Sequence, residues 1–183
     1  MAQDHVTRYE VMPIPPVDAQ TEYFEAGALR FAVEYRLLTD AIAAASSVES
    51  AAGDAAGLTE NLDDRGVAIH VFGEQDGEQL EVLRFDCFQE DPHYHYISWK
   101  DRQNHMLHLD PVADGDPLEW ALERIRTRLP QMLARAGAAE LAARVDARSI
   151  EAVLPRLTEA AYRARFQSDE QSVLAGALGK ESP

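Results

Sequence analysis

The hydrophobic period changes once along this chain, and that change restricts the fold more than any other feature of the sequence. Between residues 67 and 110, apolar and polar residues alternate with the period of two that is typical of strands. From residue 117 onwards, apolar residues recur every three to four positions, as on one face of a helix. Because the helices follow the strands instead of alternating with them, the order predicts an α+β fold.

The sheet is expected to be mainly antiparallel and to have about five strands. Turn signals such as Asp76-Gly77 and Asp91-Pro92 divide the alternating region into a four-stranded meander. A fifth strand is expected upstream, where Leu29, Phe31 and Val33 alternate with polar residues. The predicted strands are residues 29–37, 67–72, 80–88, 93–99 and 104–110.

Two to three helices are expected after the sheet. Asp116 has the character of an N-cap, Pro117 suits the first helical position, and Gly137 suits the C-terminal stop. Pro130 is expected to kink or split this first helix. Two further helices are expected near residues 138–145 and 149–166. Their apolar stripes are expected to cover the sheet face that carries Phe85, Tyr94 and Tyr96.

A chain of 183 residues suits one domain with a hydrophobic core. Three prolines, Pro13, Pro15 and Pro16, predict that the N-terminal part is extended. The expected parts are an extended arm at 1–20, a sheet region at 21–116 with a mobile loop at 40–66, a helical layer at 117–167 and a polar tail at 168–183.

The charge balance argues against several classes of partner. The chain has 32 acidic and 17 basic residues, which gives a net charge of −15. Nucleic acids and anionic membranes need clustered Lys and Arg, so neither is an expected partner. No apolar run approaches the roughly 20 residues that span a bilayer. A single cysteine, Cys87, and a start without signal-peptide features indicate a cytoplasmic protein.

One group of polar residues in the predicted sheet is a candidate functional site. Which of its residues lie side by side depends on the strand register. If Phe88 pairs with His93, then Asp86 lies opposite His95. A turn centred on residues 101–102 then places His95 opposite His108. The same sheet face would carry Arg84, Asp86, His93, His95, Trp99 and His108, with Asp86, His95 and His108 in one row across three strands.

This row supports several readings, which the sequence leaves open. Asp86, His95 and His108 are suitable ligands for Zn, Fe or Mn. Asp86 could instead orient His95 as a general base. Arg84 with protonated histidines could hold a small anionic ligand, with Trp99 as an apolar wall. The plain alternative is a polar sheet face without a site.

Two functions follow from these readings. The first is a small accessory or ligand-binding protein of unknown pathway, acting through the Arg84/Asp86/His95 face. The alternative is a small metal-dependent or acid–base enzyme that uses Asp86, His95 and His108. The same face is either exposed, a pocket, or covered by the N-terminal arm, a partner protein or a second subunit in a homodimer. His70 is expected to be a satisfied core histidine on the Leu83 side of the sheet.

Two sequence blocks resemble an uncharacterised family of small bacterial proteins that share a domain of unknown function. The blocks are RFDCF…PHYHY and DPLEWALERIRTRLPQMLARAG, the latter at 116–137. That family has no assigned activity, so the resemblance implies no catalytic residues. It implies that the sheet motif and the first helix belong to one domain.

Overall fold

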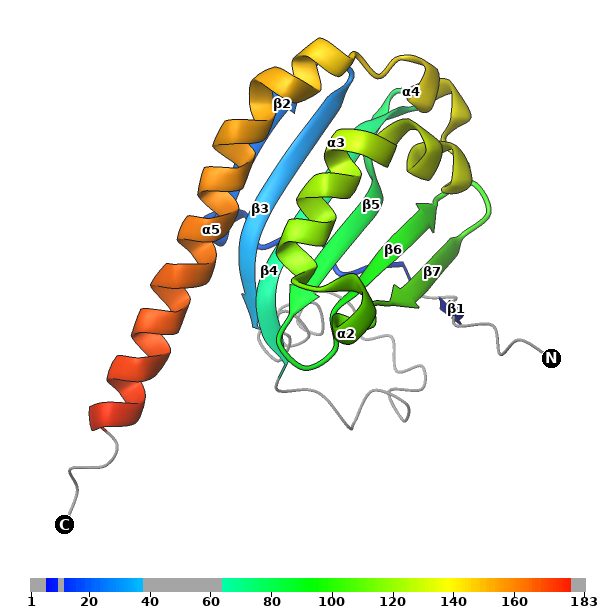
Figure 1. Cartoon of the computed structure of the whole chain (residues 1–183). Helices are drawn as coiled ribbons and strands as arrows, with labels where there is room; N and C mark the ends of the chain where they lie inside the picture. The colour runs from blue at the N-terminus through cyan, green and yellow to red at the C-terminus, as the bar shows by residue number, and fades with distance from the viewer. Residues whose placement is uncertain (1–5, 10–11, 38–63, 179–183) are drawn as a thin grey trace.

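The computed structural model describes residues 6–9, 12–37 and 64–178, which form a seven-stranded antiparallel sheet with its long helices on one face (Figure 1). The strand order across the sheet is β1-β7-β6-β5-β4-β3-β2. The strands are β1 Val6–Tyr9, β2 Thr21–Ala26, β3 Leu29–Leu37, β4 Arg65–Gln75, β5 Glu78–Phe88, β6 His93–Ser98 and β7 Gln103–His108. The α+β class is confirmed.

The sheet is larger than the five strands expected. Strand β1 lies within the predicted arm and pairs with β7 at one edge, and β2 forms a hairpin with β3 at the other. Gly27, with φ +63°, makes the tight turn of that hairpin. Strand β4 begins at Arg65, so the end of the predicted loop is strand, whereas residues 40–63 of that loop lie outside the described part of the chain.

The helices are α2 Pro111–Asp114, α3 Pro117–Arg135, α4 Ala139–Ala143 and α5 Ala147–Leu178, and a short 3-10 helix, η1, spans Asp18–Gln20. Asp116 caps α3 as expected, since its Oδ1 accepts from the amides of Leu118 and Glu119. Helix α3 continues through Pro130, and both Pro130 and Arg126, whose carbonyl loses its partner there, lie on the exposed side of the helix. Helix α5 continues to Leu178, into the segment expected to be a tail.

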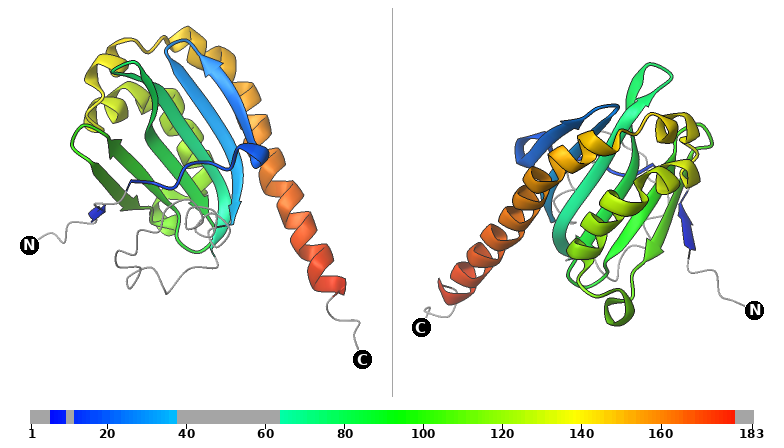
Figure 2. Two further views of the ribbon diagram at one scale, coloured as in Figure 1. Left: turned by 180° about the vertical axis from the view of Figure 1, so that it is seen from behind. Right: turned by 45° about the horizontal axis from the view of Figure 1, so that its top comes forward.

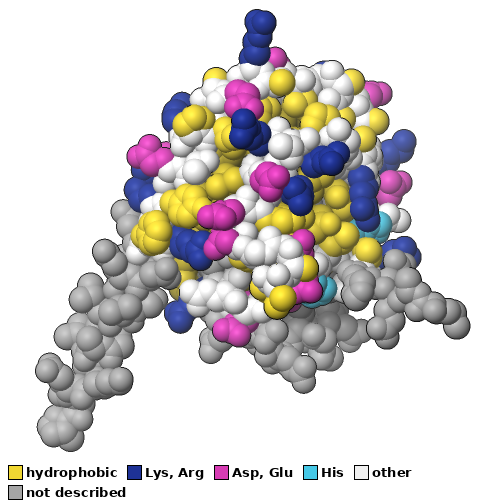
Figure 3. Space-filling model, in the orientation of Figure 1, with side chains coloured by type: hydrophobic (Ala, Val, Ile, Leu, Met, Phe, Trp, Pro, Cys, Tyr) yellow, Lys and Arg dark blue, Asp and Glu magenta, His cyan; other side chains and the backbone are white. Residues whose placement is uncertain are grey.

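The core lies between α3, α5 and one face of the sheet. Sheet residues Phe31, Ile69 and Phe85 are almost fully buried there. The main helix residues of this layer are Leu118, Ile125, Leu129, Leu133 and Leu157. The predicted helix-facing side of the sheet is therefore correct. On the outer surface of this layer, acidic and basic side chains are interspersed (Figure 3).

The N-terminal chain crosses the opposite face of the sheet, from β1 at one edge to β2 at the other (Figure 2, left). We call residues Met12–Val17 of this crossing the strap. Ile14 O accepts hydrogen bonds from Arg36 on β3 and Arg84 on β5. Part of this face is therefore covered by the N-terminal arm, which is one of the alternatives expected for it. Among the described helices, none is both long enough and apolar enough to cross a membrane.

Candidate metal centre

The register of the two central hairpins differs from the expected register by two positions. Asp86 pairs with His93, and Arg84 pairs with His95. On the other side of β6, His93 pairs with His108. Because side chains alternate with a period of two, this shift keeps every residue on its predicted face but changes its neighbours. The expected row of Asp86, His95 and His108 is thus corrected to Asp86, His93 and His108.

Three of the predicted residues meet in one cluster. Asp86 Oδ2 lies 3.3 Å from His93 Nε2 and 3.2 Å from His95 Nε2, and the three atoms lie within 4.8 Å of one another. Zinc bound tetrahedrally at 2.0–2.2 Å keeps its ligand atoms about 3.4 Å apart. The cluster therefore has the spacing of a metal-ligand set.

The outer nitrogens of both imidazoles are held by oxygen acceptors. His93 Nδ1 lies 2.7 Å from Asp91 O, and His95 Nδ1 lies 2.8 Å from Asn104 Oδ1. These oxygens can only accept, so Nδ1 is the donor in each ring. A neutral ring then carries a lone pair on Nε2, the atom that faces Asp86. This is the tautomer that a metal-binding histidine needs.

Burial and the neighbouring charges shift the pKa values of all three side chains in the cluster. Burial alone would raise the pKa of Asp86, but His93, His95 and the charge of Arg84 hold it well below its usual value. Burial lowers the pKa of His95, and this outweighs the attraction of Asp86. Burial acts in the same direction on His93, but the interaction with Asp86 prevails and raises its pKa.

With Nδ1 as its donor, a neutral His95 ring would direct the Nε2 lone pair at the Asp86 carboxylate oxygen 3.2 Å away. Two acceptors at this distance repel each other unless a positive charge lies between them. The second oxygen of Asp86, Oδ1, is buried and accepts no hydrogen bond from any described residue. Both observations point to a cation-binding role for this carboxylate.

The turn between β5 and β6 is held in place by a buried aspartate that the sequence did not single out. Asp64 accepts from the backbone amides of Glu90 and Asp91, at 3.1 and 2.9 Å. Asp91 in turn bonds two histidines, His93 through its carbonyl and His108 through Oδ1 at 2.7 Å. Asp64 therefore positions Asp91, which in turn orients the rings of His93 and His108.

Three of the predicted site residues lie outside the cluster, and two of them are His108 and Trp99. The ring centre of His108 is 6.2 Å from that of His93, and its side chain is 42% exposed. Trp99 follows the far end of β6, where its indole N–H donates to Glu81 O. Trp99 is thus not a wall of the Asp86–His93–His95 cluster.

Arg84 belongs to a neighbouring network under the strap. Its guanidinium donates to both carboxylate oxygens of Glu81, at 2.8 Å each, and to Ile14 O at 2.5 Å. The residue is 3% exposed. The guanidinium of Arg84 thus donates to acceptors of the protein itself. This corrects the expectation that Arg84 holds a small anionic ligand.

The same network contains His70 and two carboxylates, Glu34 and Glu81, that the sequence did not identify as partners. His70 is fully buried, with Nδ1 2.6 Å from Glu81 Oε1 and Nε2 3.2 Å from Glu34 Oε1. Each ring nitrogen of His70 thus faces one carboxylate. His70 pairs with Arg84 in the sheet, so it lies on the Arg84 face and not on the predicted Leu83 side. The expectation of a satisfied, buried histidine is nevertheless correct.

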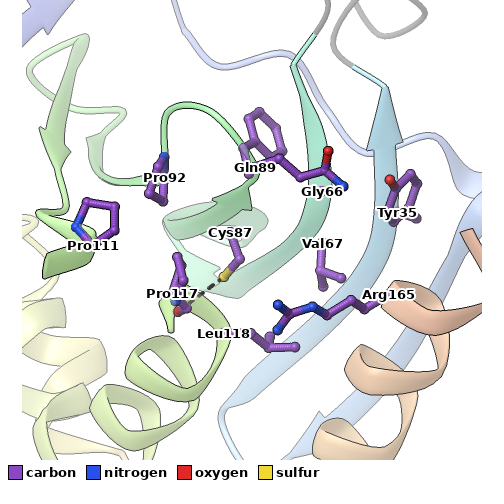
Figure 4. A pocket seen from close by; sticks show the side chains of 11 residues that line it. Tyr35, Gly66, Val67, Cys87, Gln89, Pro92, Pro111, Pro117, Leu118 and Arg165 are labelled. Carbon is purple, nitrogen blue, oxygen red and sulfur yellow. Dashed lines mark hydrogen bonds between the residues drawn. The ribbon is translucent and has the colours of Figure 1, made fainter. Parts of the chain in front are cut away.

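A separate cavity of about 270 Å³ lies on the helix side of the sheet, where Cys87, Pro117 and Arg165 line it (Figure 4). The Cys87 thiol donates to Pro117 O at 3.4 Å, and burial raises its pKa. A thiol with a raised pKa is a poor nucleophile. Arg165 is paired with Asp116 at 2.8 Å. This cavity does not join the Asp86–His93–His95 cluster, which faces the opposite side.

Comparison with known proteins identifies one family. No curated protein and no solved structure matches the chain. The family described as Domain of unknown function (DUF7700) matches residues 23–161, which include the sheet from β2 to β7, the cluster and most of the helical layer. The chain is a member of this family.

Proposed function

We propose that this protein binds a divalent transition-metal ion through Asp86, His93 and His95. The observation that carries the proposal is the convergence of two Nε2 atoms on one carboxylate oxygen, with both Nδ1 atoms held by oxygen acceptors. Holding the outer nitrogen fixes the ring and makes the inner nitrogen a better ligand.

The ligand types narrow the choice of metal. Two imidazoles and a carboxylate suit Zn, Fe or Mn, and the same set occurs in non-haem iron centres. Ca²⁺ and Mg²⁺ prefer oxygen ligands throughout, which this cluster does not offer. Among these metals we take Zn²⁺ as the first probe.

Metal binding as such agrees with an accessory or carrier role, in which the bound ligand is a cation instead of the anion considered from sequence. A metal-dependent enzyme is the second candidate function. It is favoured by the count of three protein ligands, because catalytic sites keep at least one coordination position open. A cytoplasmic location remains part of the proposal and is supported by the single free cysteine.

The test is metal content and Zn²⁺ binding of the purified full chain. We expect about one equivalent of metal, and a melting temperature that rises on adding Zn²⁺. Ligand at 100 times its Kd stabilises a protein by about 2.7 kcal/mol. Asp86→Asn, His93→Ala and His95→Ala should each abolish the shift.

The matched control is His105→Ala, since His105 lies on β7 opposite Tyr96 and is not part of the cluster. This variant should bind Zn²⁺ as the unaltered protein does. A protein that is purified without metal, and whose melting temperature does not respond to Zn²⁺, Fe²⁺, Mn²⁺ or Co²⁺, would reject the proposal.

A further inference from the structure

We propose that His108 is a fourth ligand, which closes the Asp86–His93–His95 cluster from its exposed side when the metal binds. This inference rests on the proposed metal binding and specifies its coordination. It assigns a role to a residue that lies outside the three-residue cluster.

The first support is a pattern that all three histidines share. His93, His95 and His108 each have Nδ1 within 2.8 Å of an oxygen acceptor. For His108 the acceptor is the carboxylate of Asp91, and a carboxylate–histidine–metal arrangement is common in metal sites. The Nε2 atom of His108 is thereby left as the available ligand atom, as in the other two rings.

The second support is the position of His108 in the sheet. It is the direct cross-strand partner of His93, on the same face as Asp86. Two imidazoles bound to one zinc ion at 2.0–2.1 Å have ring centres about 5 Å apart. The observed separation is 5.0 Å for His93 and His95 and 6.2 Å for His93 and His108. The ring centre of His108 is thus about 1 Å farther from that of His93 than two imidazoles on one zinc ion would be.

The surroundings of His108 permit a displacement of its side chain. Its side chain is 42% exposed, so it is not held by packing on every side. The residue after it, Leu109, donates its amide to Pro92 O at 2.8 Å. The end of β7 is thus attached to the same turn that carries Asp91, so the backbone of His108 and its acceptor keep their relative positions when the side chain moves.

A fourth protein ligand changes the chemistry of the site. With Asp86 and three histidines, a tetrahedral Zn²⁺ ion has no open position, as in structural zinc sites. The inference therefore favours a role in holding the metal over the enzyme considered as the second candidate.

The experiment uses Co²⁺ as a spectroscopic substitute for Zn²⁺ in the full chain. We expect the strong visible absorption of four-coordinate Co²⁺ in the unaltered protein. His108→Ala should weaken this absorption and lower Zn²⁺ affinity at least tenfold, while His105→Ala should change neither. The variant should fold, because an exposed side chain is removed, and circular dichroism of the metal-free protein checks this.

The outcomes separate the inference from the proposed function. Unchanged absorption and affinity in His108→Ala would overturn the inference, and binding that is lost in Asp86→Asn would still support the metal site. A lower affinity with an unchanged spectrum would also overturn it, because His108 would then act on the metal without ligating it. Absence of any binding in the unaltered protein would reject both.

Discussion

At the scale of single residues, Asn104 decides which nitrogen of His95 faces Asp86. Its side-chain oxygen accepts from His95 Nδ1 at 2.8 Å, and both residues are buried. The donor is thereby fixed on the outer side of the ring, and the lone pair on the inner side. Asn104 is thus a positioning residue for the proposed ligand His95.

Replacing Asn104 tests this role. Asn104→Leu should lower Zn²⁺ affinity by about 10- to 100-fold, the usual effect of removing an outer partner of a metal ligand. Asn104→Asp should keep the affinity within a few fold, because a carboxylate oxygen accepts from the same N–H. Isothermal titration with Zn²⁺ measures both. Equal affinities of the leucine and aspartate variants would contradict the assignment.

At the scale of elements, the strap is attached to the sheet by buried charges. Arg36 donates to Glu34 and to the carbonyls of Ile14 and Pro15, while the amide of Val17 donates to Glu34. Both Arg36 and Glu34 are almost fully buried. Since a strap rich in proline has few amides of its own to offer, side chains of the sheet supply most of its hydrogen bonds.

Removing one of these charges should release the strap. Arg36→Met leaves the carboxylate of Glu34 buried without its arginine, which costs about 3–5 kcal/mol of unfolding free energy. Hydrogen exchange at the Val17 amide should become faster. The matched control is Arg126→Met, whose exposed pair with Glu151 is worth about 0–1 kcal/mol. Urea unfolding compares the two, and similar losses in both variants would contradict the buried role of Arg36.

At the scale of the whole molecule, the same network predicts sensitivity to acid. Burial opposes ionisation of Glu34 and Glu81, but Arg36, Arg84 and His70 prevail and lower both pKa values from 4.5 to about 2. The unfolded chain therefore takes up these protons at a higher pH than the folded protein does. The stabilisation is fully present above pH 4.5 and is lost as the pH falls towards 2.

Urea unfolding measured between pH 7 and pH 2.5 should show this loss, at most about 3 kcal/mol for each carboxylate. Glu81→Gln should be less stable at pH 7 and should depend less steeply on pH, because one of the two groups no longer titrates. The same steepness in both proteins would show that Glu81 does not contribute.

The sequence predicted much of the fold and the residue types of the site, but not which of these residues contact one another. The alternation around Asp86, His93 and His95 placed all three on one face, as observed. It did not decide which histidine lies opposite Asp86, because registers two positions apart present the same faces. Asn104 and Asp64 carried no signal, since each acts through a partner that is distant along the chain.

The network of Glu34, His70, Glu81 and Arg84 was missed for a similar reason, because it also depends on strand register. A break in register between Val71 and Phe72 pairs Val71 with Leu83 and Phe72 with Glu81. This irregularity lets Glu81 reach Arg84, although regular alternation would place the two on opposite faces. Glu34 and Arg36 belong to the polar residues that alternate with Leu29, Phe31 and Val33, and the strap contributes to burying the face on which they lie.

By itself, the sequence determined the order of the five strands β3 to β7 and of the helices after them, the helix-facing side of the sheet and the shared face of Asp86, His93 and His95. These properties follow from local periodicity, which a chain carries in any short segment. The tertiary structure alone decided the register, the break between Val71 and Phe72 and the path of the strap. They depend on pairings such as that of Arg84 with Ile14, 70 positions apart, whose energy exists only when distant segments meet.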